Sequence, residues 1–237
     1  MTIKTQSGVA LILVLLVTSF VSAVGLGLAV VVFIDQLASG NHRGSAVMLY
    51  AADAGIELAA RDIAQLADWN AALDGTTPGR FTDGAPTGVR AIPGGGSVSL
   101  TAETHLLNCG RRSGCTSAQM DANSRERPWG ANNPRWQLYA YGPFQEMVNA
   151  ARPVQCYLAV WVADDSREAD GNPAADAEVD ESGRGVLRVR AEAFGPLGGR
   201  RAIEAELARV CRQLDGEEDC LPGIRVQSWQ ELRLLLP

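Results

Sequence analysis

The N-terminal segment is the feature that most constrains this chain of 237 residues. No charged residue occurs between Thr5 and Ile34, and 21 of the 26 residues from Val9 to Ile34 are apolar. About 20 such residues are enough for a helix to cross the hydrocarbon core of a bilayer. The segment therefore excludes a purely soluble protein and predicts a membrane-spanning helix.

Three interpretations of this segment compete. A cleaved secretory signal has an apolar core of roughly 7–15 residues and a small-residue exit site. Val21-Ser22-Ala23 fits such a site, but the apolar run continues beyond it to Ile34. A plain membrane anchor fits both the length and the flanking Lys4. The third interpretation uses the boundary at Gly8, where a short polar leader changes abruptly to apolar residues.

Four short motifs carry a resemblance to a known family. They are Gly8-Val9-Ala10-Leu11-Ile12, Ala51-Ala52-Asp53-Ala54-Gly55-Ile56-Glu57, Gly130-Ala131-Asn132-Asn133-Pro134-Arg135-Trp136 and Tyr141-Gly142-Pro143. Their order and spacing, with the apolar run after the first, resemble PilX-type minor pilins of type IV pili. The tip pseudopilin of type II secretion, GspK, begins similarly, but the head here is short for that protein, which favours the pilus.

The resemblance implies a processing site and a set of partners. Prepilin peptidase would cut between Gly8 and Val9 and methylate the new amino group. The helix would anchor the chain in the bacterial inner membrane, with its head in the periplasm, until the chain joins an extracellular fibre. The implied partners are minor and major pilins that pack on the N-terminal helix, the peptidase, the inner-membrane assembly platform and a tip adhesin involved in cell adhesion.

One position departs from the pattern of the family. Most pilins carry Glu at the fifth mature position, which is Leu13 here. A carboxylate at membrane depth is costly unless it is paired. Its absence implies that this subunit does not make the usual contact with a neighbour's amino group, and this favours a role at or near the tip, where the subunit promotes pilus assembly.

We expect an α+β fold in which a long N-terminal helix packs on a small antiparallel sheet. The expected segments are a leader at 1–8, a transmembrane and fibre-core helix at 9–36, an amphipathic helix at 37–70, and a β-rich periplasmic head at 71–237. No proline precedes Pro78, so nothing forbids one continuous helix. Several residues of low helix propensity favour breaks, and they are Gly25, Gly27, Gly40, Asn41 and Gly44.

Apolar periodicity places the packing surfaces. A stripe at helical spacing consists of Ala46, Leu49, Ala52, Ile56, Ala59, Ile63 and Leu66. Strand-like alternation occurs at 97–103, 136–141, 154–162, 186–194 and 202–211. In the hairpin formed by the last two segments, we expect Arg188, Arg190 and Glu192 to meet Glu204 and Glu206 on a solvated face. We expect the tail at 227–235 to dock on the head as an amphipathic helix or an edge strand.

Five cysteines follow the apolar run, where export would permit disulfides. We favour Cys109–Cys115 and Cys211–Cys220, each of which closes a short loop, with Cys156 as a buried thiol. The main rival is Cys156–Cys211. A zinc site is disfavoured because the chain has no Cys-x-x-Cys pair.

The acidic residues gather between 164 and 181, where eight carboxylates face one arginine. This segment sums to −7 while the whole chain carries −6, so net charge indicates neither a nucleic-acid partner nor a uniform acidic field. A solvated hairpin loop is the plain interpretation. Because the tip pseudopilins bind calcium, a calcium site remains an alternative, with Asp164, Asp165, Asp170 and Asp176 as its candidate ligands.

Nothing in the sequence indicates an enzyme. His42 and His105 are the two histidines, and neither lies beside a nucleophile motif, a metal-binding His pair or a phosphate loop. No resident cofactor is expected beyond the possible calcium. The alternative to a pilin is a single-pass, membrane-anchored binding module of the cell envelope, and retention of Met1–Gly8 in the mature chain would favour it.

Overall fold

The computed structural model of the chain describes residues 7–122, 133–149, 153–168, 171–176, 185–214 and 217–233, without side chains at 7–8 and 211–222. The chain divides into two compact units, Met1–Gly44 and Ser45–Pro237. From here on, "the head" means the whole second unit, which begins at Ser45 and so includes residues before the expected limit at 71. Helix α1 (Ser7–Ile63) supplies the first unit and the first element of the head.

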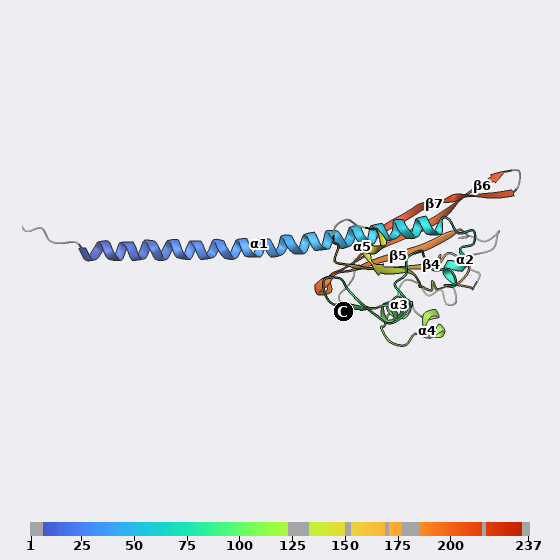
Figure 1. Cartoon of the computed structure of the whole chain (residues 1–237), viewed down its shortest axis with the longest axis horizontal. Coiled ribbons are helices and arrows are strands. Elements are labelled where there is room, and N and C mark those ends of the chain that lie inside the picture. Colours follow the sequence, from blue (N-terminus) through green and yellow to red (C-terminus); the bar gives the residue numbers. More distant parts are fainter. Residues whose placement is uncertain are drawn as a thin grey trace, which may run out of the picture. The chain divides into compact units, whose positions relative to one another are not determined.

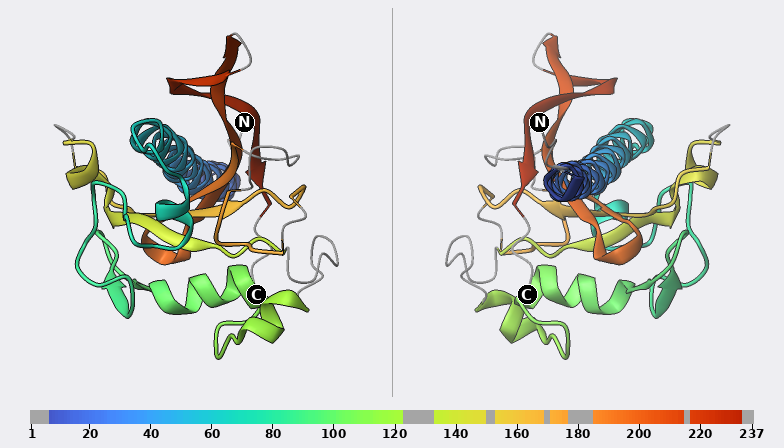
Figure 2. Two further views of the ribbon diagram at one scale, coloured as in Figure 1. Left: turned by 90° about the vertical axis from the view of Figure 1, so that its right-hand side faces the viewer. Right: turned by 90° about the vertical axis from the view of Figure 1, so that its left-hand side faces the viewer.

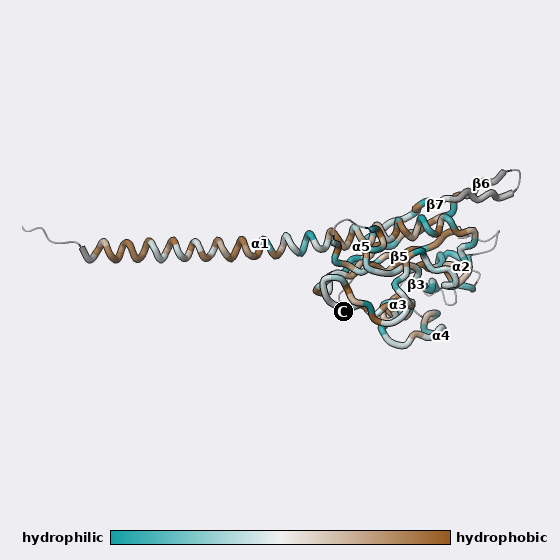
Figure 3. The backbone as a smooth tube through the Cα atoms, in the orientation of Figure 1, coloured by the Kyte–Doolittle hydropathy of each residue, from teal (hydrophilic) through white to brown (hydrophobic). Residues whose placement is uncertain are grey.

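The first unit is a helix with an apolar surface (Figure 3). The large apolar side chains from Val9 to Leu37 each leave 46–70% of their surface exposed. The helix is continuous through Gly25, Gly27 and Gly40, so the breaks expected there are absent. A Cβ added at any of these glycines would meet no atom within 4 Å, which means that no contact within the chain requires them.

The head is built on a five-stranded antiparallel sheet of order β3-β4-β5-β6-β7 (Figure 1). The strands are β3 (Gln137–Pro143), β4 (Tyr157–Asp164), β5 (Val186–Phe194), β6 (Arg200–Leu214) and β7 (Glu217–Leu232). A separate two-stranded sheet consists of β1 (Val89–Ala91) and β2 (Ser97–Ser99). The remaining helices are α2 (Asn70–Leu73), α3 (Leu100–Cys109), α4 (Ser117–Asp121) and α5 (Phe144–Met147). The expected α+β class is confirmed.

The second half of α1 packs on one face of this sheet (Figure 2). Its buried side chains are small or aliphatic, and they are Ala51, Ala52, Ile56, Ala59, Ala60 and Ile63. A Cβ added to Gly55 would lie 2.9 Å from a methyl group of Leu158 in β4, so this glycine lets the helix approach the sheet closely. The expected apolar stripe is confirmed in this part of the helix.

The helix ends at Ile63, earlier than the expected limit at residue 70. Trp69 is buried, and its indole N–H donates to the carbonyl oxygen of Ile63 at 3.1 Å. This bond satisfies one of the carbonyls that every helix leaves unpaired at its C-terminus. The Trp69 ring also packs under the guanidinium of Arg209, 4.3 Å from its centroid.

The opposite face of the sheet is also covered, because α3 and α4 lie there (Figure 2). A second apolar cluster forms between α3, the β1–β2 hairpin and the sheet, and it includes Leu100, Ile92, Trp136 and Trp161. The expectation of a solvated face was therefore wrong. Arg188, Glu192 and Glu204 are buried beneath this layer.

Helix α3 occupies a segment for which we expected a strand at 97–103. The strand β2 stops at Ser99, whose hydroxyl accepts a hydrogen bond from the backbone N–H of Ala102 and caps the helix. The helix ends at Gly110, which has the left-handed φ of 67°. A serine before a helix and a glycine after it are the ordinary signals for its two ends. The sequence prediction followed the short alternating pattern at 97–103 and missed these two signals.

The two edges of the main sheet differ. The outer edge of β3 is hydrogen-bonded to the segment 79–83, through bonds such as Gly79 N–H to the Tyr139 carbonyl at 2.8 Å. The strand β7 forms the other edge, which confirms the edge-strand alternative for the tail. Trp229 of β7 donates its indole N–H to Asp53 of α1 at 2.9 Å.

Candidate functional site

The apolar half of α1 is the main candidate site. Within the described part of the chain, α1 is the one helix that is long and apolar enough to cross a membrane. Gly8 and Val9 lie in its first turn, and Val9 and Leu13 are 61% and 57% exposed. No ionisable side chain lies between Val9 and Ile34, and 21 of these 26 residues are apolar, so this surface is suited mainly to apolar packing against lipid or other helices.

The acidic segment after β4 brings two of the expected calcium ligands together. Asp164 and Asp165 are buried at the end of β4. Asp165 accepts hydrogen bonds from the backbone N–H of Arg167 at 3.1 Å and from its guanidinium at 3.3 Å. Arg167 also bonds Glu206 of β6 at 3.0 Å, so Asp165 and Glu206 already share a cationic partner.

Asp176 has a different role, as a link between loops. Its Oδ1 accepts a hydrogen bond from Gly185 N–H at 2.6 Å, and its own N–H donates to the side chain of Asn70 at 2.7 Å. Among the residues whose positions are described, no group of three or more His, Cys, Asp or Glu residues is arranged to hold a metal ion. Asp170 lies outside the described residues, so calcium binding stays a prediction.

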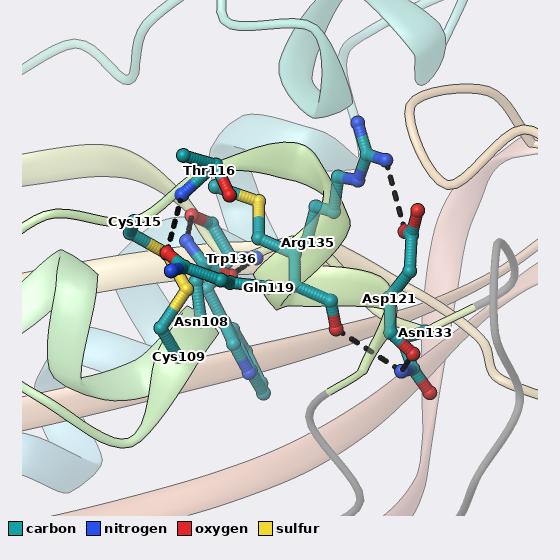
Figure 4. Close-up of a disulfide and its surroundings, with 10 residues drawn as sticks. Asn108, Cys109, Cys115, Thr116, Gln119, Asp121, Asn133, Arg135 and Trp136 are labelled. Atoms are coloured by element: carbon teal, nitrogen blue, oxygen red, sulfur yellow. Dashed lines mark hydrogen bonds and ion pairs between the residues drawn. A yellow bond between two sulfur atoms is a disulfide. The ribbon is translucent and has the colours of Figure 1, made fainter.

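A disulfide closes the turn after α3 (Figure 4). Cys109 and Cys115 are bonded, with their Cα atoms 5.9 Å apart. The next residue, Thr116, is the N-cap of α4, and its backbone N–H donates to the Gln119 side chain at 3.0 Å. The disulfide therefore fixes the distance between the end of α3 and the start of α4.

The same region is attached to the sheet by side-chain amides (Figure 4). Asn108 donates to the carbonyl of Trp136 at 2.9 Å and accepts from the N–H of Trp136 at 2.7 Å. Asn133 donates to the carbonyls of Met120 and Asp121 at 3.1 and 2.7 Å. We call α3, the disulfide turn and α4, residues 100–121, the helical cap.

Of the other three cysteines, Cys156 is the buried thiol that we expected, and the Cys211–Cys220 bond stays a prediction. Cys156 is buried with a free thiol, and burial raises its pKa from 9.0 to about 11. The rival bond between Cys156 and Cys211 is therefore absent. The β6–β7 register places Cys211 directly opposite Cys220, while their side chains lie outside the described residues. Directly opposed positions in antiparallel strands lie within the Cα separation that a disulfide requires.

A buried ion cluster lies between the helical cap and the sheet. Arg200 of β6 bonds Glu192 of β5 and, at 2.6 Å, Glu103 of α3. Arg188 of β5 forms an ion pair with Glu204 of the neighbouring strand β6. Burial alone would lower the pKa of Arg200, but hydrogen bonds and the charges of Glu192 and Glu103 outweigh it and raise that pKa.

Sequence reasoning found the pairing of Arg188 with Glu204. It missed the bonds of Arg200 to Glu192 and Glu103, and it missed that Arg188, Glu192 and Glu204 are buried. Aromatic rings help to enclose the arginines. Arg188 lies 5.2 Å from the centroid of Trp136, and Arg200 lies 5.0 Å from that of Phe194, its cross-strand neighbour in β5. Because its charges are paired with one another, the cluster is suited to holding the cap on the sheet rather than to acid–base chemistry.

Comparison with family models, with curated proteins and with solved structures found no match for this chain.

Proposed function

We propose that the chain is a minor pilin that is processed after Gly8 and incorporated into a type IV pilus at or near its tip, where it promotes assembly. In this role it is first a single-pass protein of the bacterial inner membrane, with its head in the periplasm, and then part of an extracellular fibre. The partners are the other pilins, prepilin peptidase and the assembly platform of the inner membrane.

The observation that carries the proposal is the two-part character of α1. Immediately after Gly8, in its first turn, the helix enters a run of 26 residues of which 21 are apolar and none is charged. It then contributes a closely packed stripe of small residues, including Gly55, to an antiparallel sheet. A helix that serves first as an anchor and later as a fibre core needs apolar surface on all sides of one half and a rigid attachment to its head in the other.

Leu13 supports a place near the tip. In the fibre, a carboxylate at the fifth mature position would neutralise the amino group of a neighbouring subunit, and an apolar side chain cannot. Its absence fits a subunit that makes no such contact. The alternative, a membrane-anchored envelope module, requires no processing at Gly8.

Substitution of Gly8 tests the proposal. In the host, Gly8→Val should leave the full-length precursor in the inner membrane and remove the chain from sheared fibres. Ser7→Ala, which changes the neighbouring leader residue, is the matched control and should be processed normally. Fibres that contain the Gly8→Val chain at the normal level would overturn the proposal.

A further inference from the structure

Six consecutive residues of α1 have a low intrinsic preference for the helix, and they are Ser39-Gly40-Asn41-His42-Arg43-Gly44. Glycine ranks near the bottom of the helix propensity scale, and serine, asparagine and histidine rank well below alanine. The nineteen residues that follow, 45–63, contain six alanines and one glycine. We call residues 39–44 the glycine segment, and by propensity it is weaker than the part of α1 that follows it.

Within the described chain, no close packing supports the glycine segment. All six of its residues are exposed. A Cβ added to Gly40 or Gly44 would meet no atom within 4 Å. Most of the stability of helices in proteins comes from the packing of one helix face rather than from propensity. The glycine segment is therefore poor in both sources of helix stability.

The parts of α1 on either side are better supported. After the segment, Ser45 accepts a hydrogen bond from Arg201 of β6 at 2.8 Å, and Met48 packs against the turn between β5 and β6. Before the segment, the apolar run ends at Ile34, and inside a bilayer no water is available to replace its backbone hydrogen bonds. Water can replace those of the exposed glycine segment, so opening of the helix costs least there.

We propose that the glycine segment is a hinge, where the helix opens by local unfolding and α1 bends while the parts on either side stay helical. Local opening of native proteins begins where buried contacts are few and backbone hydrogen bonds are exposed. Hinges are a few residues that absorb a change in backbone dihedral angles. The continuous helix of the structure is the closed state of this hinge.

The inference goes beyond the proposed function and does not depend on it. Any protein that is anchored by this apolar helix would bend at the same place, whether or not it is processed after Gly8. A bend lets the head change direction while the apolar half of α1 stays in its bilayer or fibre.

Amide hydrogen exchange of the full-length chain in detergent micelles tests the opening. We expect the amides of residues 39–44 to exchange at least about a hundredfold faster than those of residues 51–60. The double substitution Gly40→Ala/Gly44→Ala should slow exchange in the glycine segment about thirtyfold, because two such changes favour the helix by about 2 kcal/mol together. Exchange at residues 51–60 should stay unchanged.

The matched control is Gly25→Ala/Gly27→Ala. These two glycines also lie in α1, and a Cβ added to either would meet no atom within 4 Å. The control should leave exchange at residues 39–44 unchanged. Equal exchange rates at 39–44 and 51–60 in the wild-type chain would overturn the inference, as would a Gly40→Ala/Gly44→Ala chain in which exchange is not slowed.

A pair of spin labels at the exposed positions Asp35 and Glu57 tests the bend. The labels are attached to ketone-bearing residues, so that the native cysteines are kept. In a straight helix these positions lie about 33 Å apart along the axis. We expect the wild-type chain to show a component at shorter distances and the Gly40→Ala/Gly44→Ala chain to show one narrow peak. One narrow peak in both chains would overturn the hinge, even if exchange is fast.

Discussion

Replacing Glu192 with Gln tests whether the face of the sheet that lies under the helical cap is a buried interface. The Glu192 side chain has no exposed surface, and its carboxylate pairs with Arg200 and, at 3.6 Å, with Arg190. Glutamine has nearly the same shape, so the substitution removes the charge without opening a cavity. Both arginines would stay in place beneath the helical cap.

The expected loss follows from this burial. Removing one member of a buried ion pair costs about 3–5 kcal/mol, because the partner charge stays desolvated. Arg200 keeps its bond to Glu103, which places the expected cost at the lower end, about 3 kcal/mol. For a domain of this size that corresponds to a fall in melting temperature of about 6–12 °C.

The assay is thermal and urea unfolding of the full-length chain in detergent, with Glu231→Gln as the matched control. Glu231 of β7 pairs with Arg201 at 3.3 Å, and the two side chains are 38% and 41% exposed. An exposed pair contributes less than about 1 kcal/mol. Equal, small effects of the two substitutions would refute the buried cluster and restore a solvated face.

Three further predictions concern stability and reactivity. Gly55→Ala should lower the free energy of unfolding by up to about 2 kcal/mol, because the new Cβ would meet side chains of β4 and β5 at 2.9 and 3.0 Å. The control is Gly44→Ala, whose new Cβ meets no atom within 4 Å and which should raise the free energy of unfolding by up to about 1 kcal/mol. A gain in stability at both sites in urea titrations would contradict the close packing at Gly55. Cys156 should resist iodoacetamide at pH 8 in the native chain, as followed by mass spectrometry. Rapid alkylation of the native chain would contradict the burial of this thiol. Because the pKa of Cys156 is raised from 9.0 to about 11, the protonated thiol contributes stability below pH 9, and that stability is lost as the pH rises toward 11. Substituting both Cys109 and Cys115 by Ser should cost about 2 kcal/mol for a loop of this length, and an unchanged urea midpoint would show that the bond adds nothing.

The periodic parts of the fold could be predicted from the sequence. Alternation placed β5 at Val186–Phe194 and directed Leu187, Val189 and Ala191 to the core face, as observed. The helical stripe around Ile56 was equally clear, because long runs of regular spacing average out local exceptions. These features depend on residues that lie near one another in the chain.

What could not be predicted depends on residues distant in sequence. The charges at Arg188 and Glu204 read as a solvated face because α3, which covers them, is encoded about 90 residues earlier. The segment after Ser99 read as a strand because a ten-residue helix offers few turns of periodicity. The candidate processing site is a property of the sequence alone, with Gly8 before the apolar run that begins at Val9.

The mass of the mature chain is the most direct test of the central claim. Protein purified from membranes or fibres of its host should begin at Val9 and carry one methyl group on the Val9 amine. The intact mass should therefore lack residues 1–8 and exceed the sum for 9–237 by a single methyl. A mature chain that retains Met1–Gly8 would contradict the assignment as a pilin and favour a simple membrane-anchored module.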